Sequence, residues 1–187
     1  MAATNYYVGL MHYPVYNKHK QIVTTSITNM DVHDISRVCC TYGIAKYILI
    51  NPLQSQKQLY TKIINFWQNK GKAYQPDRAE ALNKITFAHS YEEACEYLKN
   101  QEKACPVVVT TSANRREKNI QYDYFHTEHD DGSPVFVLFG TGYGLAEEIH
   151  QKADYALEPI ESHSAYNHLS VRSAVAIVLD RLIPKNK

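Results

Sequence analysis

The sequence lacks the paired cysteines that build disulfide frameworks or zinc sites. Its four cysteines are Cys39, Cys40, Cys95 and Cys105, and no two of them form a C-x-x-C pair. Zinc-ligand spacing is absent as well. We therefore expect small apolar thiols in a reducing compartment, and no bound metal.

Targeting signals, membrane spans and linkers are also missing. Met1–Tyr7 has no basic stretch followed by an apolar run, so we expect no secretory signal peptide. The longest apolar runs have the length of strands, which predicts no membrane span. No Pro-, Gly- or Ser-rich linker divides the 187 residues, a length that suits one compact domain. The expectation is a soluble cytoplasmic protein with a single domain over residues 1–187.

A large excess of charge of either sign is absent, too. The chain has 20 Lys and Arg against 19 Asp and Glu, a net charge of +1, which excludes a uniformly basic coat. Local patches can still supply a field that binds nucleic acid. The candidates are Lys18–Lys20, Lys70–Arg78 and Arg115–Lys118, although each also fits an ordinary solvated face.

What the sequence does contain is an alternation of short apolar runs with longer amphipathic ones, which is typical of βαβ units around a largely parallel sheet. Strands are expected at Tyr6–Met11, Lys46–Ile50, Ile85–Ala88, Pro106–Thr111, Pro134–Phe139 and Tyr155–Leu157. Helices are expected at Asp31–Tyr42, Gln54–Asn69, Ser90–Asn100, after Gly144, and at Ser170–Ile183.

Three details of these helices can be tested. Asp31 is expected to cap the first helix. The second helix should bury Leu59, Ile63 and either Phe66 or Trp67, and the last should carry Ala174, Ile177, Val178 and Arg181 along one side. The polar segments Tyr13–Asn29 and Arg115–Ser133 fit no element, although Ile22–Ile27 could form a strand. Loops of this length are usually functional or mobile.

A glycine-rich turn is the first motif that could carry function. Val135–Phe139 is followed by Gly140-Thr141-Gly142-Tyr143-Gly144 and then by a helix. Alternate glycines permit positive φ and let the backbone approach a ligand, and the helix start should point free N–H groups outward. The pattern is neither a dinucleotide fingerprint nor a Walker loop. It fits a tight strand-to-helix turn as well as a nucleotide-like ligand.

The second motif follows the last strand. Leu157-Glu158-Pro159-Ile160 leads into Tyr166-Asn167-His168-Leu169-Ser170-Val171-Arg172-Ser173-Ala174. This is a strand that ends at a proline, a polar loop, and a helix that begins with small residues. Taken alone, it also fits an ordinary helix capped by Asn167 or Ser170.

Together and in this order, the two motifs resemble the last two motifs of the SPOUT methyltransferases, the α/β-knot superfamily. The resemblance is strongest to the stand-alone family related to the tRNA (guanine) methyltransferase domain. It extends over nearly the whole chain, through His12–Asn17, Thr28–Ile35, Thr41–Gly43, Asn51–Leu53 and Pro76–Arg78.

The resemblance implies an α/β fold with a mostly parallel sheet, helices on both faces and a C-terminal trefoil knot, an exception to the general absence of knots. It also implies an S-adenosylmethionine-dependent RNA methyltransferase that forms homodimers, with the site near the dimer interface. The cofactor would lie bent in the knot, held mostly by the backbone of the loops Thr110–Ala113, Leu138–Gly144 and Leu157–Val171.

Within those loops, the resemblance places these residues at the cofactor: Thr110, Thr111, Ser112, Leu138, Phe139, Gly140, Thr141, Gly142, Gly144, Leu157, Pro159, Ile160, Asn167, His168, Leu169, Ser170 and Val171. We expect no further RNA-binding domain after the last helix. The expected RNA substrate, a tRNA or an rRNA, would then be held by basic residues of this domain or of a dimer.

Methyl transfer requires alignment of the nucleophile and, for a ring nitrogen or hydroxyl, a base that takes a proton. The candidates are Asn29, Asp31 and His33 at one helix start and Arg172 at another, with Asp34 and His168 as weaker ones. Asp31 fits a helix cap equally well, and Arg172 fits a salt-bridging helix residue. The weight of Asn29 and His33 comes from the resemblance.

Two alternatives stay open. The chain could be a non-catalytic module that binds the cofactor or RNA on the same fold, because no side chain is an unambiguous base. It could also be an unrelated nucleotide-binding α/β protein with a phosphate on the glycines, but it lacks a nearby lysine and an acidic residue at dinucleotide spacing.

Overall fold

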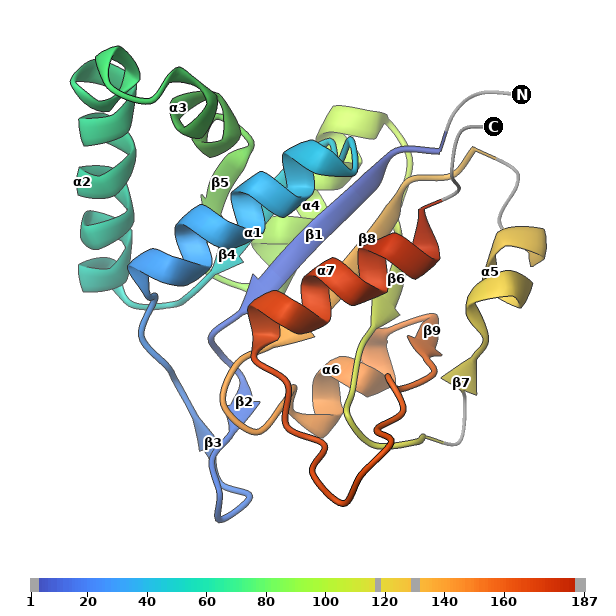
Figure 1. The fold of residues 1–187 in the computed structure, drawn as a ribbon. Helices are drawn as coiled ribbons and strands as arrows, with labels where there is room; N and C mark the ends of the chain where they lie inside the picture. The colour runs from blue at the N-terminus through green and yellow to red at the C-terminus, as the bar shows by residue number, and fades with distance from the viewer. Residues whose placement is uncertain (1–3, 117–118, 129–131, 184–187) are drawn as a thin grey trace.

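The computed structural model describes residues 4–116, 119–128 and 132–183, and a seven-stranded sheet runs through it (Figure 1). Its strands are β1 (Tyr6–Met11), β4 (Lys46–Ile50), β5 (Ile85–Ala88), β6 (Val107–Thr110), β7 (Asn119–Ile120), β8 (Val135–Gly140) and β9 (Tyr155–Leu157). They lie in the order β5-β4-β1-β8-β6-β9-β7, and every pairing is parallel. The prediction of a mostly parallel sheet is confirmed.

The helices cover both faces of this sheet, as predicted (Figure 1). They are α1 (Asn29–Thr41), α2 (Gln54–Asn69), the 3-10 helix η1 (Gly71–Ala73), α3 (Pro76–Leu82), α4 (Tyr91–Glu102), α5 (Tyr122–Glu128), α6 (Glu147–Lys152) and α7 (Val171–Leu182). α1 and α7 pack side by side on one face, and α4 and α6 lie on the other. Within the described ranges, none of these helices has the length and apolar character needed to cross a bilayer.

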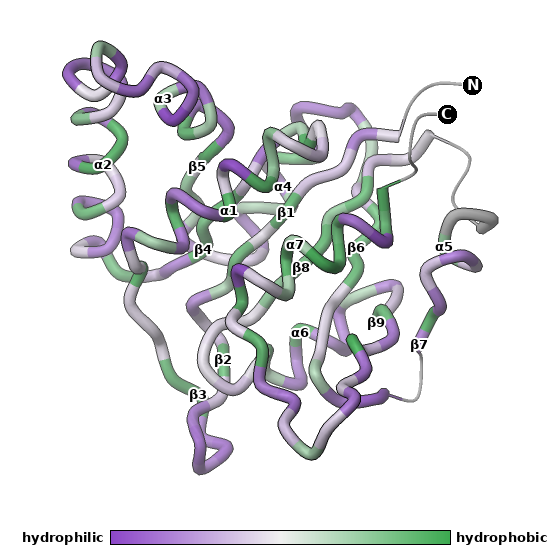
Figure 2. The backbone as a smooth tube through the Cα atoms, in the orientation of Figure 1, coloured by the Kyte–Doolittle hydropathy of each residue, from purple (hydrophilic) through white to green (hydrophobic). Residues whose placement is uncertain are grey.

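Side-chain alternation along the central strands builds two cores. In β1, Val8 and Leu10 join the core beneath α1 and α7, whereas Tyr7 and Met11 join the one beneath α4 and α6. Both faces are therefore buried, which explains why these strands read as continuous apolar runs, green along the sheet in Figure 2. The four cysteines are free thiols, and Cys39 lies fully inside the core.

The first helix starts differently from the prediction. Its N-cap is Thr28, whose side chain accepts a hydrogen bond from the Asp31 backbone N–H (3.1 Å) and donates one to the Asp31 carboxylate (2.6 Å). Asp31 is thus the third residue of α1, not its cap. The Thr28 side chain thus satisfies a backbone N–H at the helix start, and the Asp31 carboxylate accepts the proton of the Thr28 hydroxyl, in an arrangement similar to a capping box. Asp31 is buried by this arrangement.

The predicted stripes of two helices are confirmed in part. In α2, Ile64 is buried and Tyr60, Ile63 and Trp67 are partly buried, so Ile63 and the Trp67 alternative pack inward as predicted, whereas Leu59 and Phe66 are exposed. In α7 the buried residues are Val175, Val178, Leu179 and Leu182, and Arg181 is exposed. Apolar residues on adjacent faces of each helix allowed more than one stripe of helical period, and packing against α1, α3 and the sheet selected this one.

Both polar segments contain regular structure. Tyr13–Asn29 forms a hairpin of β2 (Val15–Tyr16) and β3 (Ile22–Val23), so the strand at Ile22–Ile27 is real but ends after two residues. β7 and α5 lie within Arg115–Ser133, where 117–118 and 129–131 are outside the described residues. The first three and last four residues of the predicted domain are outside them as well. α3 was not predicted, although Pro76 at its first position is a helix-start signal.

Because the strands are parallel, their C-terminal ends meet at one edge of the sheet. Met11, Ile50, Thr110, Gly140 and Leu157 end there. The loops that leave this edge are the places where α/β sheets generally bind ligands.

Candidate functional site

The glycine turn after β8 has a shape that only glycine allows at two points. A Cβ added at Gly140 would lie 2.5 Å from the Leu145 nitrogen and 2.8 Å from the Gly144 carbonyl carbon. Gly142 has φ +62°, and its Cβ would lie 2.8 Å from the Tyr16 carbonyl oxygen. The turn therefore folds tightly onto its own continuation and onto β2.

Backbone hydrogen bonds fix the same turn to the β2 strand. The Tyr16 N–H donates to Gly144 O, and the Tyr143 N–H donates to Tyr16 O, both at 2.9 Å. At the start of α6, the Ala146 N–H donates to Pro14 O and the Glu147 N–H to the Tyr16 hydroxyl. The expectation of free N–H groups at this helix start is wrong for these two, because Pro14 and Tyr16 supply their acceptors.

A buried histidine, His12, is linked to the glycine turn by hydrogen-bonded threonines. His12 Nδ1 lies 2.9 Å from Thr25 Oγ1, which lies 2.5 Å from Thr141 Oγ1, and the Thr141 hydroxyl also donates to Met11 O. Burial lowers the pKa of His12 to about 4, against a smaller opposing influence of Asp31. The ring is therefore neutral, and its Nε2 is buried without a hydrogen-bond partner among the described residues.

Three loops from the sheet edge enclose a cavity of about 920 Å³. The predicted cofactor residues that line it are Thr111, Ser112, Phe139, Gly140, Thr141, Gly142, Gly144, Ile160, Asn167, His168, Leu169 and Val171. A volume of this size is within the range of small-molecule and cofactor sites. The folded chain thus brings together segments that are up to 60 residues apart in the sequence (111 to 171).

The other predicted cofactor residues do not line the cavity. Leu138, Leu157 and Pro159 are buried in or next to their strands. The Thr110 hydroxyl is buried between His150 Nδ1 (2.9 Å) and Tyr155 O (3.3 Å). Ser170 caps α7 through a hydrogen bond from the Ser173 N–H. These residues do not face the cavity but support the loops that line it.

Two of the predicted catalytic residues meet at the cavity wall. Arg172 Nη1 lies 3.0 Å from Asp31 Oδ1, and both residues line the cavity. Arg172 Nε also approaches the exposed carboxylate of Asp34, at 3.4 Å. The Asp31 side chain is 7% exposed and that of Arg172 is 29% exposed. This places a buried, paired carboxylate where α1 and α7 begin.

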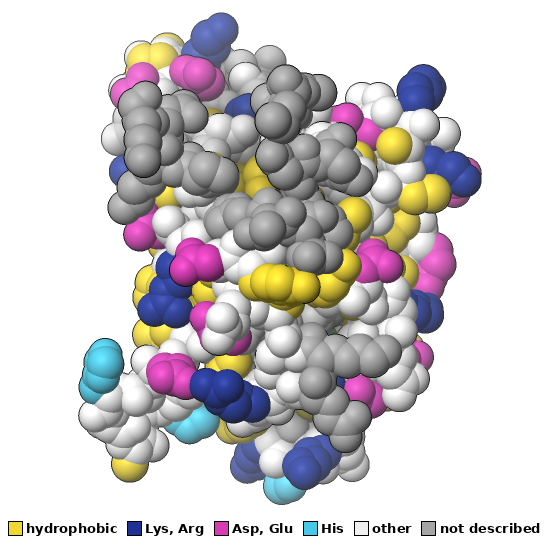
Figure 3. All heavy atoms as spheres, turned by 90° about the vertical axis from the view of Figure 1, so that its right-hand side faces the viewer, with side chains coloured by type: hydrophobic (Ala, Val, Ile, Leu, Met, Phe, Trp, Pro, Cys, Tyr) yellow, Lys and Arg dark blue, Asp and Glu magenta, His cyan; other side chains and the backbone are white. Residues whose placement is uncertain are grey.

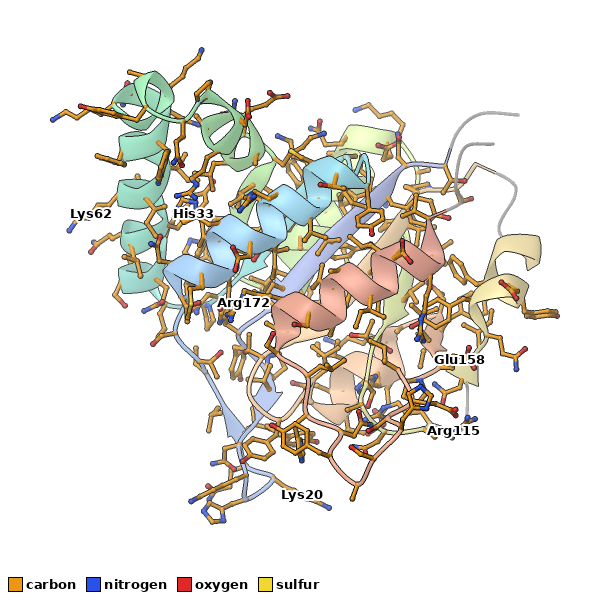
Figure 4. All side chains as sticks on the ribbon, in the orientation of Figure 1. Lys20, His33, Lys62, Arg115, Glu158 and Arg172 are labelled. Atoms are coloured by element: carbon orange, nitrogen blue, oxygen red, sulfur yellow. The ribbon has the colours of Figure 1, made fainter. Side chains whose placement is uncertain are left out.

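The other two predicted catalytic residues lie elsewhere. Asn29 is exposed at the start of α1 and is not part of the cavity wall. His33 packs edge-on against Trp67 of α2, with ring centroids 5.2 Å apart, on the side of α1 away from Arg172 (Figure 4). Burial, together with the nearby Arg78 cation, lowers the pKa of His33. The helix turns His33 away from Asp31 because the two side chains are two residues apart.

The sequence did not identify several residues of the cavity wall. Thr25, Ser26 and Thr28 come from the polar segment before α1, and Tyr122 and Glu158 come from α5 and the end of β9. The length and polarity of Tyr13–Asn29 marked that segment, but no spacing rule pointed to a residue within it. Tyr122 could not be found from sequence, because it reaches the cavity wall on α5, a helix that the sequence did not predict; its hydroxyl there donates to Glu158 O (3.3 Å).

The wall formed by residues 158–170 is organised mainly by its own side chains. The Ser162 hydroxyl bonds to the carbonyls of Ser164 (2.9 Å) and Tyr166 (2.7 Å). Links to the loop after β6 are an Asn167 Nδ2 bond to Ala113 O (3.3 Å) and an exposed ion pair between Arg115 and Glu161. No group of three or more metal-ligating side chains that could hold an ion is found in the described parts of the chain.

Comparison with known proteins gives a consistent result. A family model described as SAM-dependent RNA methyltransferase matches residues 5–184. The chain is 34% identical to an uncharacterised protein of Aquifex aeolicus, over all of this chain and 92% of that protein. It is 39% identical to a tRNA (guanine-N(1)-)-methyltransferase of Nitratidesulfovibrio vulgaris, over 96% of this chain but only 42% of that enzyme.

Solved structures support the same fold at lower sequence identity. The SpoU methyltransferase AviRb of Streptomyces viridochromogenes, in complex with its cofactor AdoMet, superposes with a TM-score of 0.61. The match covers 98% of this chain and 58% of that one, at 13% identity. The α/β fold is thus shared with a cofactor-bound methyltransferase.

Proposed function

The chain belongs to the family of S-adenosylmethionine-dependent RNA methyltransferases, and we propose that the cavity at the C-terminal edge of its sheet holds the cofactor beside the target nucleotide. One observation carries this proposal. The loops after β6, β8 and β9 converge on one cavity, and the buried pair of Asp31 and Arg172 lies in its wall. Family membership favours an active enzyme over a module that only binds.

The size and lining of the cavity suit S-adenosylmethionine. Gly140, Gly142 and Gly144 line it without side chains, so the turn offers bare backbone to a ligand. Backbone groups can read the edge of an adenine ring, and the Gly142 N–H forms no backbone hydrogen bond within the described residues. The hydroxyl and amide side chains of Ser112 and Asn167 line the same cavity and suit ribose hydroxyls.

The charge of the cavity wall also fits. S-adenosylmethionine is a cation overall, because its sulfonium and ammonium outweigh its carboxylate. Among the described residues, the carboxylates of Asp31 and Glu158 line the cavity together with the guanidinium of Arg172. When bound, the cofactor supplies an electrophilic methyl group. The chain must then orient the nucleophile, exclude water and accept a proton.

The proposed substrate is tRNA, with guanine N1 as the first atom to test, because relatives 37% and 39% identical are tRNA (guanine-N(1)-)-methyltransferases. The chain spans 42% of the length of those two enzymes. Asp31 is the proposed acceptor of the N1 proton, and the bound cofactor would supply the methyl group and keep the electron pair of its S–CH₃ bond. Arg172 holds Asp31 in place and can contact an oxygen of the base.

The proposal includes three further properties implied by the family resemblance: a trefoil knot through which the C-terminal segment passes, a homodimer, and a cytoplasmic location. The parallel packing of α1 and α7 beside the cavity offers one face for a second copy, with Met30 exposed at its edge. Sedimentation of the purified protein tests the dimer, which would be seen as twice the 21.5 kDa mass of the chain.

The decisive experiment separates cofactor binding from turnover. Calorimetry measures the affinity for S-adenosylmethionine, and transfer of a labelled methyl group to unfractionated tRNA measures activity. Asp31→Asn should lower activity by about 10²–10⁴-fold, as expected for loss of a general base. Its cofactor affinity should fall by no more than about tenfold, because asparagine still accepts the bond from Thr28 and the Glu158 carboxylate remains in the cavity wall.

Asp34→Asn is the matched control. Asp34 also contacts Arg172, but it is exposed, so the variant should keep its activity within about threefold. If wild-type protein binds no S-adenosylmethionine, the cavity assignment is wrong. If Asp31→Asn retains full activity, another group accepts the proton.

A further inference from the structure

The tip of the β2–β3 hairpin is a second feature of the cavity edge. Lys18, His19 and Lys20 occupy it, and all three side chains are exposed. The hairpin projects from the body of the molecule below the C-terminal edge of the sheet (Figure 1), and Lys20 lies at its far end (Figure 4). It therefore presents two lysines and a histidine to solvent beside the cavity.

Local hydrogen bonds hold this tip in one shape. The Asn17 carboxamide oxygen accepts the N–H groups of His19 (2.8 Å) and Gln21 (3.0 Å). Its amide nitrogen donates to the Gln21 side chain, and the Asn17 and Gln21 backbones pair at 3.0 Å. Lys20 adopts φ +58°, the left-handed conformation that such a turn requires. An ordered tip loses less conformational entropy when it binds a partner.

The charges of the tip are not neutralised by the chain itself. The first acidic residue in the sequence is Asp31, and neither Lys18, His19 nor Lys20 forms an ion pair with any residue that the structure describes. By contrast, Arg115, Arg116 and Arg172 all pair with carboxylates. On the face seen in Figure 3, basic and acidic side chains are interspersed over most of the surface, and basic side chains and a histidine lie together at its lower edge.

The hairpin is joined directly to the cavity wall. Its first strand is bonded to the glycine turn through Tyr16, and its second strand leads to Thr25 and Ser26, which line the cavity. Thr25 lies five positions after Lys20, which corresponds to at most roughly 16 Å of extended chain. The tip thus lies within this distance of the cavity wall.

We propose that this hairpin tip, Lys18–Lys20, binds the phosphate backbone of the RNA next to the nucleotide that enters the cavity. The inference rests on the proposed function. A base that is modified inside a pocket must leave its stack, and contacts to the flanking phosphates hold the strand while it does so. Lysine ammonium groups bind phosphates as point charges, and the ion atmosphere released from RNA favours this contact at low salt.

The test compares two variants that lose the same charge. Lys18→Ala/Lys20→Asn removes both lysines at the tip, and asparagine tolerates the positive φ of position 20. Lys62→Ala/Lys99→Ala removes two exposed lysines from α2 and α4, and Lys62 points into solvent on the far side of α1 from the cavity (Figure 4). The dissociation constant for fluorescently labelled unfractionated tRNA is measured from 0.05 to 0.3 M salt, together with calorimetry for S-adenosylmethionine.

The tip variant should bind tRNA about tenfold more weakly near 0.1 M salt. Its plot of log affinity against log salt should be shallower by about 1.4–1.8, the contribution of two phosphates. Its affinity for S-adenosylmethionine should match the wild type, and the control should keep the wild-type salt dependence. Equal weakening in both variants, an unchanged slope in the tip variant, or its dissociation from dimer to monomer would overturn the inference. Failure of the proposed function itself is distinct, since it is seen as absent cofactor binding or methyl transfer in the wild type.

Discussion

The two principal walls of the cavity are held in different ways. The glycine turn, 140–144, is bonded through its backbone to β1 and β2, and the buried His12 and the half-buried Thr25 and Thr141 are hydrogen-bonded beside it. The 158–170 wall is exposed along most of its length, and its serines bond largely to one another. We infer that the first wall is preformed and that the second adjusts when cofactor and RNA bind.

The largest expected effect comes from breaking the preformed wall. Gly140→Ala forces a Cβ against the Leu145 nitrogen and Gly144 carbon. Overpacking of this kind costs about 1–3 kcal/mol, so affinity for S-adenosylmethionine should fall about tenfold to hundredfold. Calorimetry gives the affinity, and urea unfolding gives the stability.

Gly43→Ala is the control for a general glycine effect. Gly43 has φ +67°, but its added Cβ would meet no atom within 4 Å. This variant should lose about 1 kcal/mol of stability and bind the cofactor normally. Normal binding by Gly140→Ala would show that the turn is not the rigid wall.

A second, intermediate effect should appear in acid. His12 has a pKa of about 4 in the folded protein, lowered by burial from 6.5. Between these values the unfolded chain binds more protons, so stability is complete above pH 6.5 and falls as the pH drops toward 4. The loss attributable to His12 is about 3 kcal/mol.

Urea unfolding at pH 7 and pH 4.5 measures this loss in the wild type and in His12→Asn. Asparagine can keep a hydrogen bond to Thr25 but does not titrate, so the variant should lose part of the acid dependence. The rest should include His150, whose pKa is also lowered to about 4 by burial, with Arg116 contributing. An unchanged pH profile in His12→Asn would contradict the supporting role of this histidine.

The smallest effect is expected on the adjustable wall. Arg115 and Glu161 form an ion pair whose side chains are 68% and 70% exposed. Arg115→Ala should therefore change the free energy of unfolding by less than about 0.5 kcal/mol, and cofactor affinity by less than threefold. Its neighbour Arg116, which pairs with Glu147 and is 25% exposed, should be more costly to replace. Equal losses for the two variants, measured by urea unfolding, would argue that both walls are equally firm.

Much of the sheet could be predicted, because buried parallel strands have a strong sequence pattern. Tyr6–Met11, Lys46–Ile50 and Tyr155–Leu157 have the expected bounds. In α2 the prediction placed Leu59 inside wrongly and could not choose between Phe66 and Trp67, because Leu59 and Phe66 are as apolar as the residues that pack inward. No local signal distinguishes apolar residues on neighbouring faces when the partner surface is unknown.

The parts of the site that depend on local sequence could be predicted. The contacts that depend on the packing of distant residues could not. The glycine turn and the segment before α7 reached the cavity because backbone shape is encoded locally. Asp31 pairs with Arg172, which lies 141 positions away in the sequence. The sequence predicted each residue as a candidate but did not predict their contact. His33 was grouped with Asp31 by proximity in sequence, but the helix directs it toward Trp67.

The position of β8 between β1 and β6 affects how the protein is made. β1 pairs with residues 135–140 along its whole length, so its edge stays open until that part of the chain has been synthesised. At the usual pace of translation, the roughly 90 residues between the ends of β4 and β8 take on the order of 10 s. During that interval the emerging chain exposes an apolar strand edge, a surface prone to aggregation that chaperones can shield. We expect C-terminal truncations before residue 140 to accumulate as insoluble protein, because the sheet then lacks its central strand.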